Sequence, residues 1–176
     1  MWTARQASFA ASWLILAAGT ILAMSIATTA AVGQDKPNAP QDAGIQGDDE
    51  LAKIGEPIVN EMCGTQCHGP ESLEGRRTVY EWNSSIAEMI DRGLSAPPKD
   101  LAIVRQYLKR FYGVVAVNTA SAAELSAVLG LSAKDAQAVV DYRTARGKFA
   151  DAAALKQVPE IDKTKIDEQP DALRFR

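Results

Sequence analysis

The sequence predicts an all-α protein with two small helical domains behind an N-terminal export signal and a linker. Two observations carry this prediction: apolar residues recur at helical spacing between capping and helix-ending residues, and no alternating strand pattern of useful length occurs. The 176 residues are 47% hydrophobic and 23% charged. This ordinary globular composition excludes a fully disordered chain, a collagen and a coiled coil.

Charge and rare residues narrow the classes of function. The formal net charge of −3 argues against a strongly basic nucleic-acid binder. Two cysteines are too few for a disulfide-dense scaffold. The lone histidine, His68, excludes a multi-histidine metal site and a cofactor held by two histidines of this chain.

Residues 1–33 have the features of a secretory signal peptide. Arg5 is the only charge before Asp35, an apolar run covers residues 8–27, and small residues lead to Gly33. We expect cleavage near Gly33 and a location in the bacterial periplasm. The alternative is an uncleaved membrane anchor, because about 20 apolar residues can span a bilayer. Only in that case would the protein contact a membrane.

A linker and a first helical domain follow. Residues 34–49 are predicted to be flexible because proline, glycine and polar residues dominate them. The first domain is expected over residues 50–113, where apolar residues at helical spacing indicate three helices. The first helix ends at Cys63-Gly64, the second covers residues 80–92, and the third runs from residue 99 or 100 to residue 112.

The second domain is expected over residues 114–176. Ser121 and Glu124 have the spacing of a capping box, so a helix begins after Ser121. Further helices are expected over residues 133–146, 151–158 and 162–169.

The cysteine segment carries the chemistry of the first domain. Cys63 and Cys67 are followed directly by His68, which is what covalent attachment of a c-type haem requires. Each thiol would form a thioether with one haem vinyl group, and the adjacent imidazole would bind the iron as the proximal ligand. Three residues separate the cysteines, where two are usual.

Other interpretations of the cysteines remain open. A disulfide between Cys63 and Cys67 is conceivable in an oxidising compartment, although it closes a very small loop and leaves His68 unexplained. A redox-active dithiol usually comes with a thioredoxin-like βαβ pattern, which is absent from the sequence. A zinc site would have to be completed by carboxylates alone.

Residues 50–113 resemble a short class I cytochrome c. The resemblance rests on the helix with Gly55, the cysteine–histidine motif, the pair Arg76-Arg77 and the segment from Trp82 to Gly93, and it extends to haem domains associated with periplasmic quinoprotein dehydrogenases. It implies that Gly55 lets the first helix cross closely over the helix that carries Tyr107.

The resemblance also suggests a methionine as the sixth iron ligand. Met89 is the expected ligand, because Met62 abuts Cys63 and belongs on the proximal side. The alternatives are that Met89 is an ordinary core methionine, and that the iron is five-coordinate with some ligand-binding or peroxidase activity.

Two basic residues and one aromatic residue are further candidates. Arg76 and Arg77 could neutralise the haem propionates through charge-assisted hydrogen bonds, or form a solvated basic pair in a loop. Trp82 could edge the haem or belong to the core.

The second domain resembles the helix-hairpin-helix domain of competence-type DNA-uptake proteins, through Val117–Leu125, Leu129–Ser132 and Gly147–Phe149. In DNA-binding versions, paired glycines let backbone N–H groups approach a phosphate. Here Gly130 is present, but Ser132 replaces its partner, and carboxylates replace both glycines of the second hairpin. These carboxylates are Glu160 and Asp162, which would repel phosphate.

Acidic and basic side chains balance within residues 114–176, which also argues against DNA binding. Nonspecific contact with DNA through Gly130, Lys134 and Arg143 remains open. The favoured interpretation is a compact module for protein docking or spacing.

Taken together, the sequence predicts a periplasmic monohaem c-type cytochrome that is an electron carrier rather than an enzyme. One covalently attached haem c is its expected cofactor. A periplasmic dehydrogenase or oxidase is its expected partner, and DNA is not expected to bind. Two alternatives are a DNA-handling protein of the competence type and a structural adaptor subunit of a periplasmic redox complex.

Overall fold

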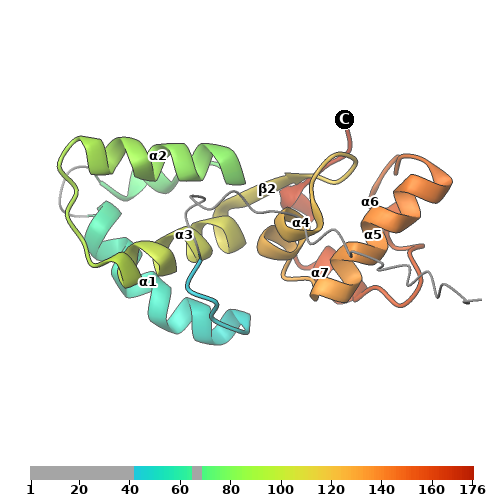
Figure 1. Cartoon of the computed structure of the whole chain (residues 1–176), viewed down its shortest axis with the longest axis horizontal. Helices are drawn as coiled ribbons and strands as arrows, with labels where there is room; N and C mark the ends of the chain where they lie inside the picture. Colours follow the sequence, from blue (N-terminus) through green and yellow to red (C-terminus); the bar gives the residue numbers. More distant parts are fainter. Residues whose placement is uncertain (1–41, 65–68) are drawn as a thin grey trace, which may run out of the picture. The chain divides into compact units, whose positions relative to one another are not determined.

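A computed structural model describes residues 42–64 and 69–176. The predicted signal peptide and the start of the linker lie outside these ranges. Figure 1 traces the elements along the chain. The helices are α1 (Asp48–Gly64), α2 (Val79–Asp91), α3 (Pro98–Tyr112), α4 (Ala122–Leu129), α5 (Ala133–Arg146), α6 (Ala152–Leu155) and α7 (Lys163–Asp167), with short 3-10 helices η1 (Pro70–Leu73) and η2 (Pro170–Ala172).

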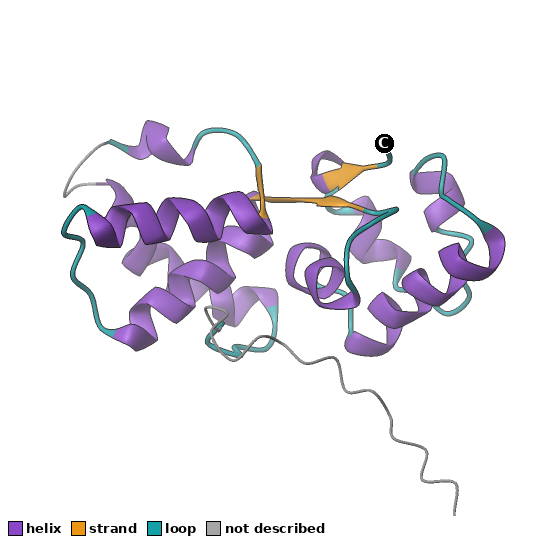
Figure 2. Cartoon of the chain, turned by 45° about the horizontal axis from the view of Figure 1, so that its top comes forward, coloured by secondary structure: helices purple, strands orange, loops and turns teal. Residues whose placement is uncertain are grey.

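The described residues also form a small parallel sheet, so the all-α prediction was wrong in this respect. Its strands are β1 (Arg77–Thr78), β2 (Gly113–Ala116) and β3 (Leu173–Arg174), in the order β1-β2-β3 (Figure 2). Both pairings are parallel. No alternation marks β2 because its first three residues are all buried, and such a strand gives an apolar run instead.

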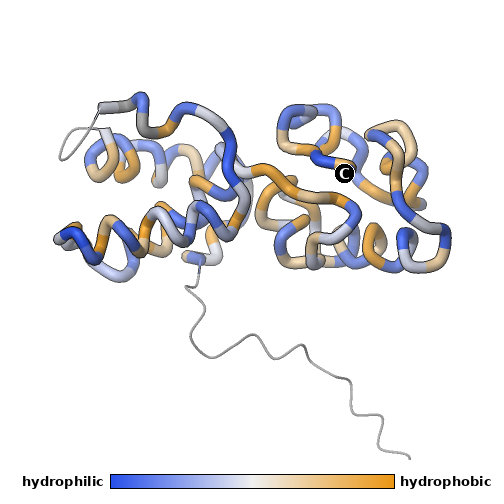
Figure 3. The backbone as a smooth tube through the Cα atoms, turned by 90° about the horizontal axis from the view of Figure 1, so that it is seen from above, coloured by the Kyte–Doolittle hydropathy of each residue, from blue (hydrophilic) through white to orange (hydrophobic). Residues whose placement is uncertain are grey.

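The sheet joins the segment between η1 and α2 to the C-terminal segment of the chain. β2 holds the segment after η1 on one side and the C-terminal segment on the other. The expected boundary between residues 113 and 114 falls inside β2. Figure 3 shows that β2 is hydrophobic along most of its length.

The close crossing of the first and third helices is confirmed. A Cβ built on Gly55 of α1 would lie 2.6 Å from Cδ2 of Tyr107 in α3. Only a glycine therefore allows these two helix backbones to approach each other so closely.

Two clusters of buried apolar residues form the interior. One joins α1, η1, α2 and α3, and its fully buried side chains include Val59, Trp82, Ile86 and Leu108. The other joins the helices that follow β2, with Leu125, Leu129, Leu155 and Ile166 among its fully buried members.

The helices after β2 form two consecutive helical hairpins. The predicted capping box is confirmed, since the Ser121 hydroxyl accepts from the Glu124 N–H and the Glu124 carboxylate accepts from the Ser121 N–H. The helix expected over residues 133–146 is α5. In contrast, α6 and α7 are shorter than the helices expected there, and each begins at an aspartate cap.

The described end of the predicted linker is attached to α3. The Ile45 N–H donates to Oε1 of Gln106 at 3.1 Å, and Nε2 of Gln106 donates to the Ile45 carbonyl at 2.6 Å. Nζ of Lys109 pairs with Asp42 at 2.7 Å. The linker assignment of residues 34–49 therefore extends too far, because α1 already begins at Asp48.

Within residues 42–64 and 69–176, no helix is both long and apolar enough to cross a bilayer.

Candidate functional site

A cavity of ≈ 510 Å³ opens beside the end of α1 and is walled by η1, α2 and α3. Its size falls in the range of small-molecule and cofactor sites, about 300–1,000 Å³. Its lining combines apolar side chains, sulfur atoms, two arginines and one glutamate. Among the lining residues are Met62, Cys63, Leu73, Arg77, Trp82, Met89, Leu94 and Leu108.

Cys63 lies in the last turn of α1 and is almost fully buried, at 3% exposure. Burial raises the pKa of its thiol, because the charged thiolate loses its hydration. Cys67 and His68, the other two members of the sequence motif, lie outside the described residues. Cys63 is therefore the member of the motif that the structure places at the cavity.

Both methionines of the described residues line this cavity. Met89 is half-buried on α2, seven residues after Trp82 and three after Ile86, as the helical spacing predicts. Met62 precedes Cys63 at the end of α1. Two thioethers and one thiol from two helices thus reach a single cavity.

Trp82 forms part of the cavity wall and is fully buried. Its Nε1–H donates to the carbonyl oxygen of Tyr112 at 2.9 Å, and its ring meets the Tyr112 ring edge-on. The indole is therefore held rigidly between α2 and the end of α3. Its two expected roles, edging the haem and belonging to the core, are compatible with this position.

The two arginines of the predicted pair, Arg76 and Arg77, have different surroundings in the structure. Arg77 lines the cavity, and its guanidinium carbon lies 4.7 Å from the centroid of the Trp82 ring. Such stacking on an indole orients the cation. Arg76 is absent from the cavity lining; its Nη1 donates to the Gly113 carbonyl at 3.0 Å. Of the predicted pair, Arg77 is the one placed to meet a negatively charged group in the cavity.

This lining fits a haem. Cys63 supplies one thiol for covalent attachment, Met89 a thioether for the iron, the apolar walls face a porphyrin, and Arg77 can meet a propionate. The second thiol and the histidine of the motif, Cys67 and His68, lie outside the described residues.

Sequence reasoning missed Ser85, Arg92 and Leu94 in the lining. Ser85 and Arg92 share the helix face of Trp82 and Met89, so helical spacing could have identified them.

The first hairpin of the C-terminal module, between α4 and α5, packs against α3. Gly130 adopts a left-handed conformation (φ +67), and a Cβ there would lie 2.8 Å from Nε of Arg110. Arg110 also donates through Nη1 to the Val128 carbonyl at 3.0 Å. This turn of the hairpin is thus occupied by a side chain of the same protein.

The second hairpin presents carboxylates. Glu160 has a positive φ of 61°, unusual for a residue other than glycine, and its carboxylate pairs with Nζ of Lys134 at 2.9 Å. Asp162 caps α7 by accepting from the Thr164 N–H at 3.0 Å. Two of the positions at which DNA-binding versions have glycines therefore carry negative charge.

Arg143 is also engaged inside the module. Its guanidinium donates to the carbonyl oxygens of Val117 and Ala120. Of the three residues considered for DNA contact, Arg143 and Gly130 have structural roles, and Lys134 is in an exposed ion pair.

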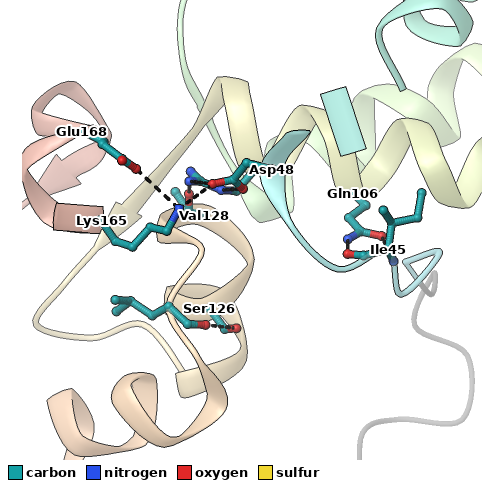
Figure 4. A network of polar contacts seen from close by, with 9 residues as sticks. Ile45, Asp48, Gln106, Ser126, Val128, Lys165 and Glu168 are labelled. Atoms are coloured by element: carbon teal, nitrogen blue, oxygen red, sulfur yellow. Dashed lines mark hydrogen bonds and ion pairs between the residues drawn. The ribbon is translucent and has the colours of Figure 1, made fainter. Parts of the chain in front are cut away.

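A buried charge network joins the N-terminus of α1 to α3 and α7 (Figure 4). Asp48 accepts from Nε and Nη2 of Arg110, at 2.6 and 2.7 Å, and from Nζ of Lys165 at 2.7 Å. Hydrogen bonding to Arg110, above all, lowers the pKa of Asp48. Arg110 is only 4% exposed, and nothing in the sequence pattern marked it as buried.

Comparisons with known proteins match part of the chain. Residues 111–174 match a family described as helix-hairpin-helix motif. An uncharacterized protein of Haemophilus influenzae is 38% identical over 60 residues, which make up 34% of this chain and 54% of that protein. The chain thus spans about half the length of this curated relative. No solved structure matches the chain.

These findings define the C-terminal part of the chain as a helix-hairpin-helix module. The residues of the cavity described above belong to the part of the chain that precedes this match.

Proposed function

We propose that the chain is an exported monohaem c-type cytochrome that transfers single electrons. The observation that carries the proposal is the cavity in which Cys63, Met89, Arg77 and Trp82 come together, although up to 26 residues separate them in the sequence. Composition and helical spacing alone do not require these four side chains to share one cavity.

Each residue has a distinct task in this proposal. The thiols of Cys63 and Cys67 would hold the haem covalently through thioether bonds to its vinyl groups. His68 and Met89 would bind the iron, a pairing that raises the potential of a haem. Arg77, held by the Trp82 ring, neutralises a propionate.

The bound haem would supply reversible one-electron chemistry, and the protein would supply orientation and electrostatics. The buried Trp82 and Leu108 make one side of the cavity apolar. We expect the electron partner to be a periplasmic dehydrogenase or oxidase. The N-terminal 33 residues provide the basis for export.

Optical spectroscopy tests the proposal. The full chain is produced in a periplasm that contains a haem-maturation system, and its oxidised and reduced spectra are recorded. We expect a c-type spectrum with a weak charge-transfer band in the oxidised form, which marks an iron–thioether bond. Met89→Ala should lose this band and keep the haem, whereas Met62→Ala, at the same cavity, should keep both. A colourless wild-type protein would refute the proposal.

A second candidate function is DNA binding, and the helix-hairpin-helix match favours it. The carboxylates of Glu160 and Asp162 and the internal bonds of Arg143 oppose it. Gel-shift measurements over a range of salt concentrations distinguish the two functions. Tight binding that falls steeply with salt, and that weakens in Lys134→Ala, would support DNA binding. We expect weak binding without a steep dependence on salt.

A further inference from the structure

The end of α2 fixes Met89 through its backbone. The Leu94 N–H donates to the Met89 carbonyl at 2.9 Å, and the Gly93 N–H donates to the Ile90 carbonyl at 3.0 Å. With Arg92 as the cap residue, these two bonds form a Schellman motif. The position of Met89 thus depends on the chain that follows the helix as well as on the helix itself.

Gly93 is required by this motif for conformational reasons alone. Its φ is +107, which residues with a side chain rarely adopt. A Cβ built on Gly93 would meet no atom within 4 Å. A substitution there would therefore disturb the backbone turn without adding a clash.

The side chains at the two ends of the motif share the proposed haem cavity. Met89 and Leu94 both line it, as does Gly93. In Schellman motifs the apolar residue after the turn commonly packs against the third residue from the helix end, which here is Met89. Because of this arrangement, a change in the turn would move the Met89 side chain.

The side-chain ion pair at this helix end is weak. The ion pair between Glu88 and Arg92 joins side chains that are 62% and 76% exposed. Exposed pairs of this kind contribute little to stability. The Schellman turn is therefore the main local restraint on the last turn of α2.

We infer that Gly93 is a positioning residue for the sixth iron ligand. By permitting the Schellman turn, it holds the Met89 thioether in the cavity and thereby stabilises the bond between sulfur and iron. This inference rests on the proposed haem function.

The test compares two glycines of the same kind. Gly147 also has a positive φ (93°), ends a helix (α5) and has no atom within 4 Å of a built Cβ. Gly93→Ala and Gly147→Ala are prepared in the full chain, loaded with haem in a maturation-competent periplasm and heated in the oxidised state. The charge-transfer band reports the thioether bond, and far-ultraviolet circular dichroism reports the helices.

We expect the band of Gly93→Ala to disappear several degrees below the unfolding of the helices. In the wild type and in Gly147→Ala the interval between the two transitions should be smaller and equal. Gly93→Asn should restore most of the wild-type interval, because asparagine tolerates a positive φ. If the Gly93→Ala protein does not accumulate, the interval of Gly93→Asn compared with that of the wild type provides the test.

Three results would count against the inference, and they are distinguishable. An unchanged interval in Gly93→Ala and Gly93→Asn would show that Gly93 has no positioning role. A haem-loaded wild type whose band survives Met89→Ala would show that Met89 is not the ligand. A wild type without haem would refute the proposed function itself.

Discussion

At the scale of single residues, the molecule depends on the absence of a side chain at Gly55. The first and third helices meet there, and the Tyr107 ring lies against the Gly55 backbone. Tyr107 is 8% exposed, and burial, as the main cause, raises its pKa to about 12, so that its hydroxyl stays protonated under physiological conditions. The ring has little room to move away from an added methyl group.

Gly55→Ala should therefore destabilise the protein. A helical glycine replaced by alanine would normally gain up to about 1 kcal/mol. The methyl group would lie 2.6 Å from the ring, and overpacking of a buried site costs about 1–3 kcal/mol. We expect a net loss of up to about 2 kcal/mol in urea unfolding.

Removal of the ring provides the control for this prediction. In a Tyr107→Ala background the clash is absent, so Gly55→Ala should become neutral or stabilising. Equal effects of Gly55→Ala in the two backgrounds would show that the two residues do not interact.

The sequence allowed some site residues to be predicted better than others. Cys63 was identified by its motif, whereas Met89 and Gly55 were identified through the resemblance to a cytochrome c. The structure places Cys63 and Met89 at one cavity. Arg76 and Arg77 are adjacent in the sequence but have different surroundings, because successive residues of an extended segment point to opposite sides. No local pattern distinguishes which of the two faces the cavity.

At the scale of elements, α2 is defined by its two ends. Thr78 precedes the helix, and its side chain accepts from the Glu81 N–H while the Glu81 carboxylate accepts from the Thr78 N–H. The hydrogen bonds from Thr78 to the Glu81 carboxylate, above all the one from the Thr78 backbone, lower the pKa of Glu81. Because α2 carries both Trp82 and Met89, this cap contributes to the proposed site.

Thr78→Ala should weaken the start of α2. Loss of a helix-capping hydroxyl typically costs about 1 kcal/mol, and we expect thermal unfolding of the variant to begin at a lower temperature. Thr78→Ser retains the hydroxyl and should behave like the wild type. A Thr78→Ser variant as unstable as Thr78→Ala would indicate that the threonine methyl group, and not the cap, is what matters.

Helices were easier to predict than strands in this chain. The helix expected over residues 133–146 agrees with α5. Its apolar residues recur over several turns, and a capping residue stands at each end. In contrast, β1 and β3 have two residues each. A segment so short contains no period, and its pairing depends on partners far away in the sequence.

At the scale of the whole described chain, the Asp48 network connects α1 and α3 with the helix-hairpin-helix module. Asp48 begins α1, Arg110 belongs to α3, and Lys165 belongs to α7 (Figure 4). Arg110 is buried, so loss of its carboxylate partner would leave a buried charge without its counter-ion.

Asp48→Asn should destabilise the protein by about 1–3 kcal/mol at neutral pH, less than a fully buried pair would, because the Asp48 side chain is 30% exposed. The folded-state pKa of Asp48 lies below its ordinary value of 3.8. The stabilisation is thus present above about pH 4 and is lost as pH falls through the lower, folded-state pKa.

Denaturant unfolding of wild type and variant between neutral pH and pH 3 measures this dependence. The difference between the two proteins should shrink toward the acidic end. Asp49→Asn, which changes the adjacent exposed carboxylate, should cause a much smaller loss. A difference that stays constant with pH would contradict the assignment to Asp48.

The central claim, that a haem is bound covalently through Cys63 and Cys67, is tested most directly by the intact mass of the denatured protein. The full chain is purified from a maturation-competent periplasm, unfolded and extracted with acidified organic solvent before mass spectrometry. We predict a polypeptide that retains the mass of one haem, and loss of that mass in the double variant Cys63→Ala/Cys67→Ala. A wild-type protein with the mass of the polypeptide alone would contradict the account.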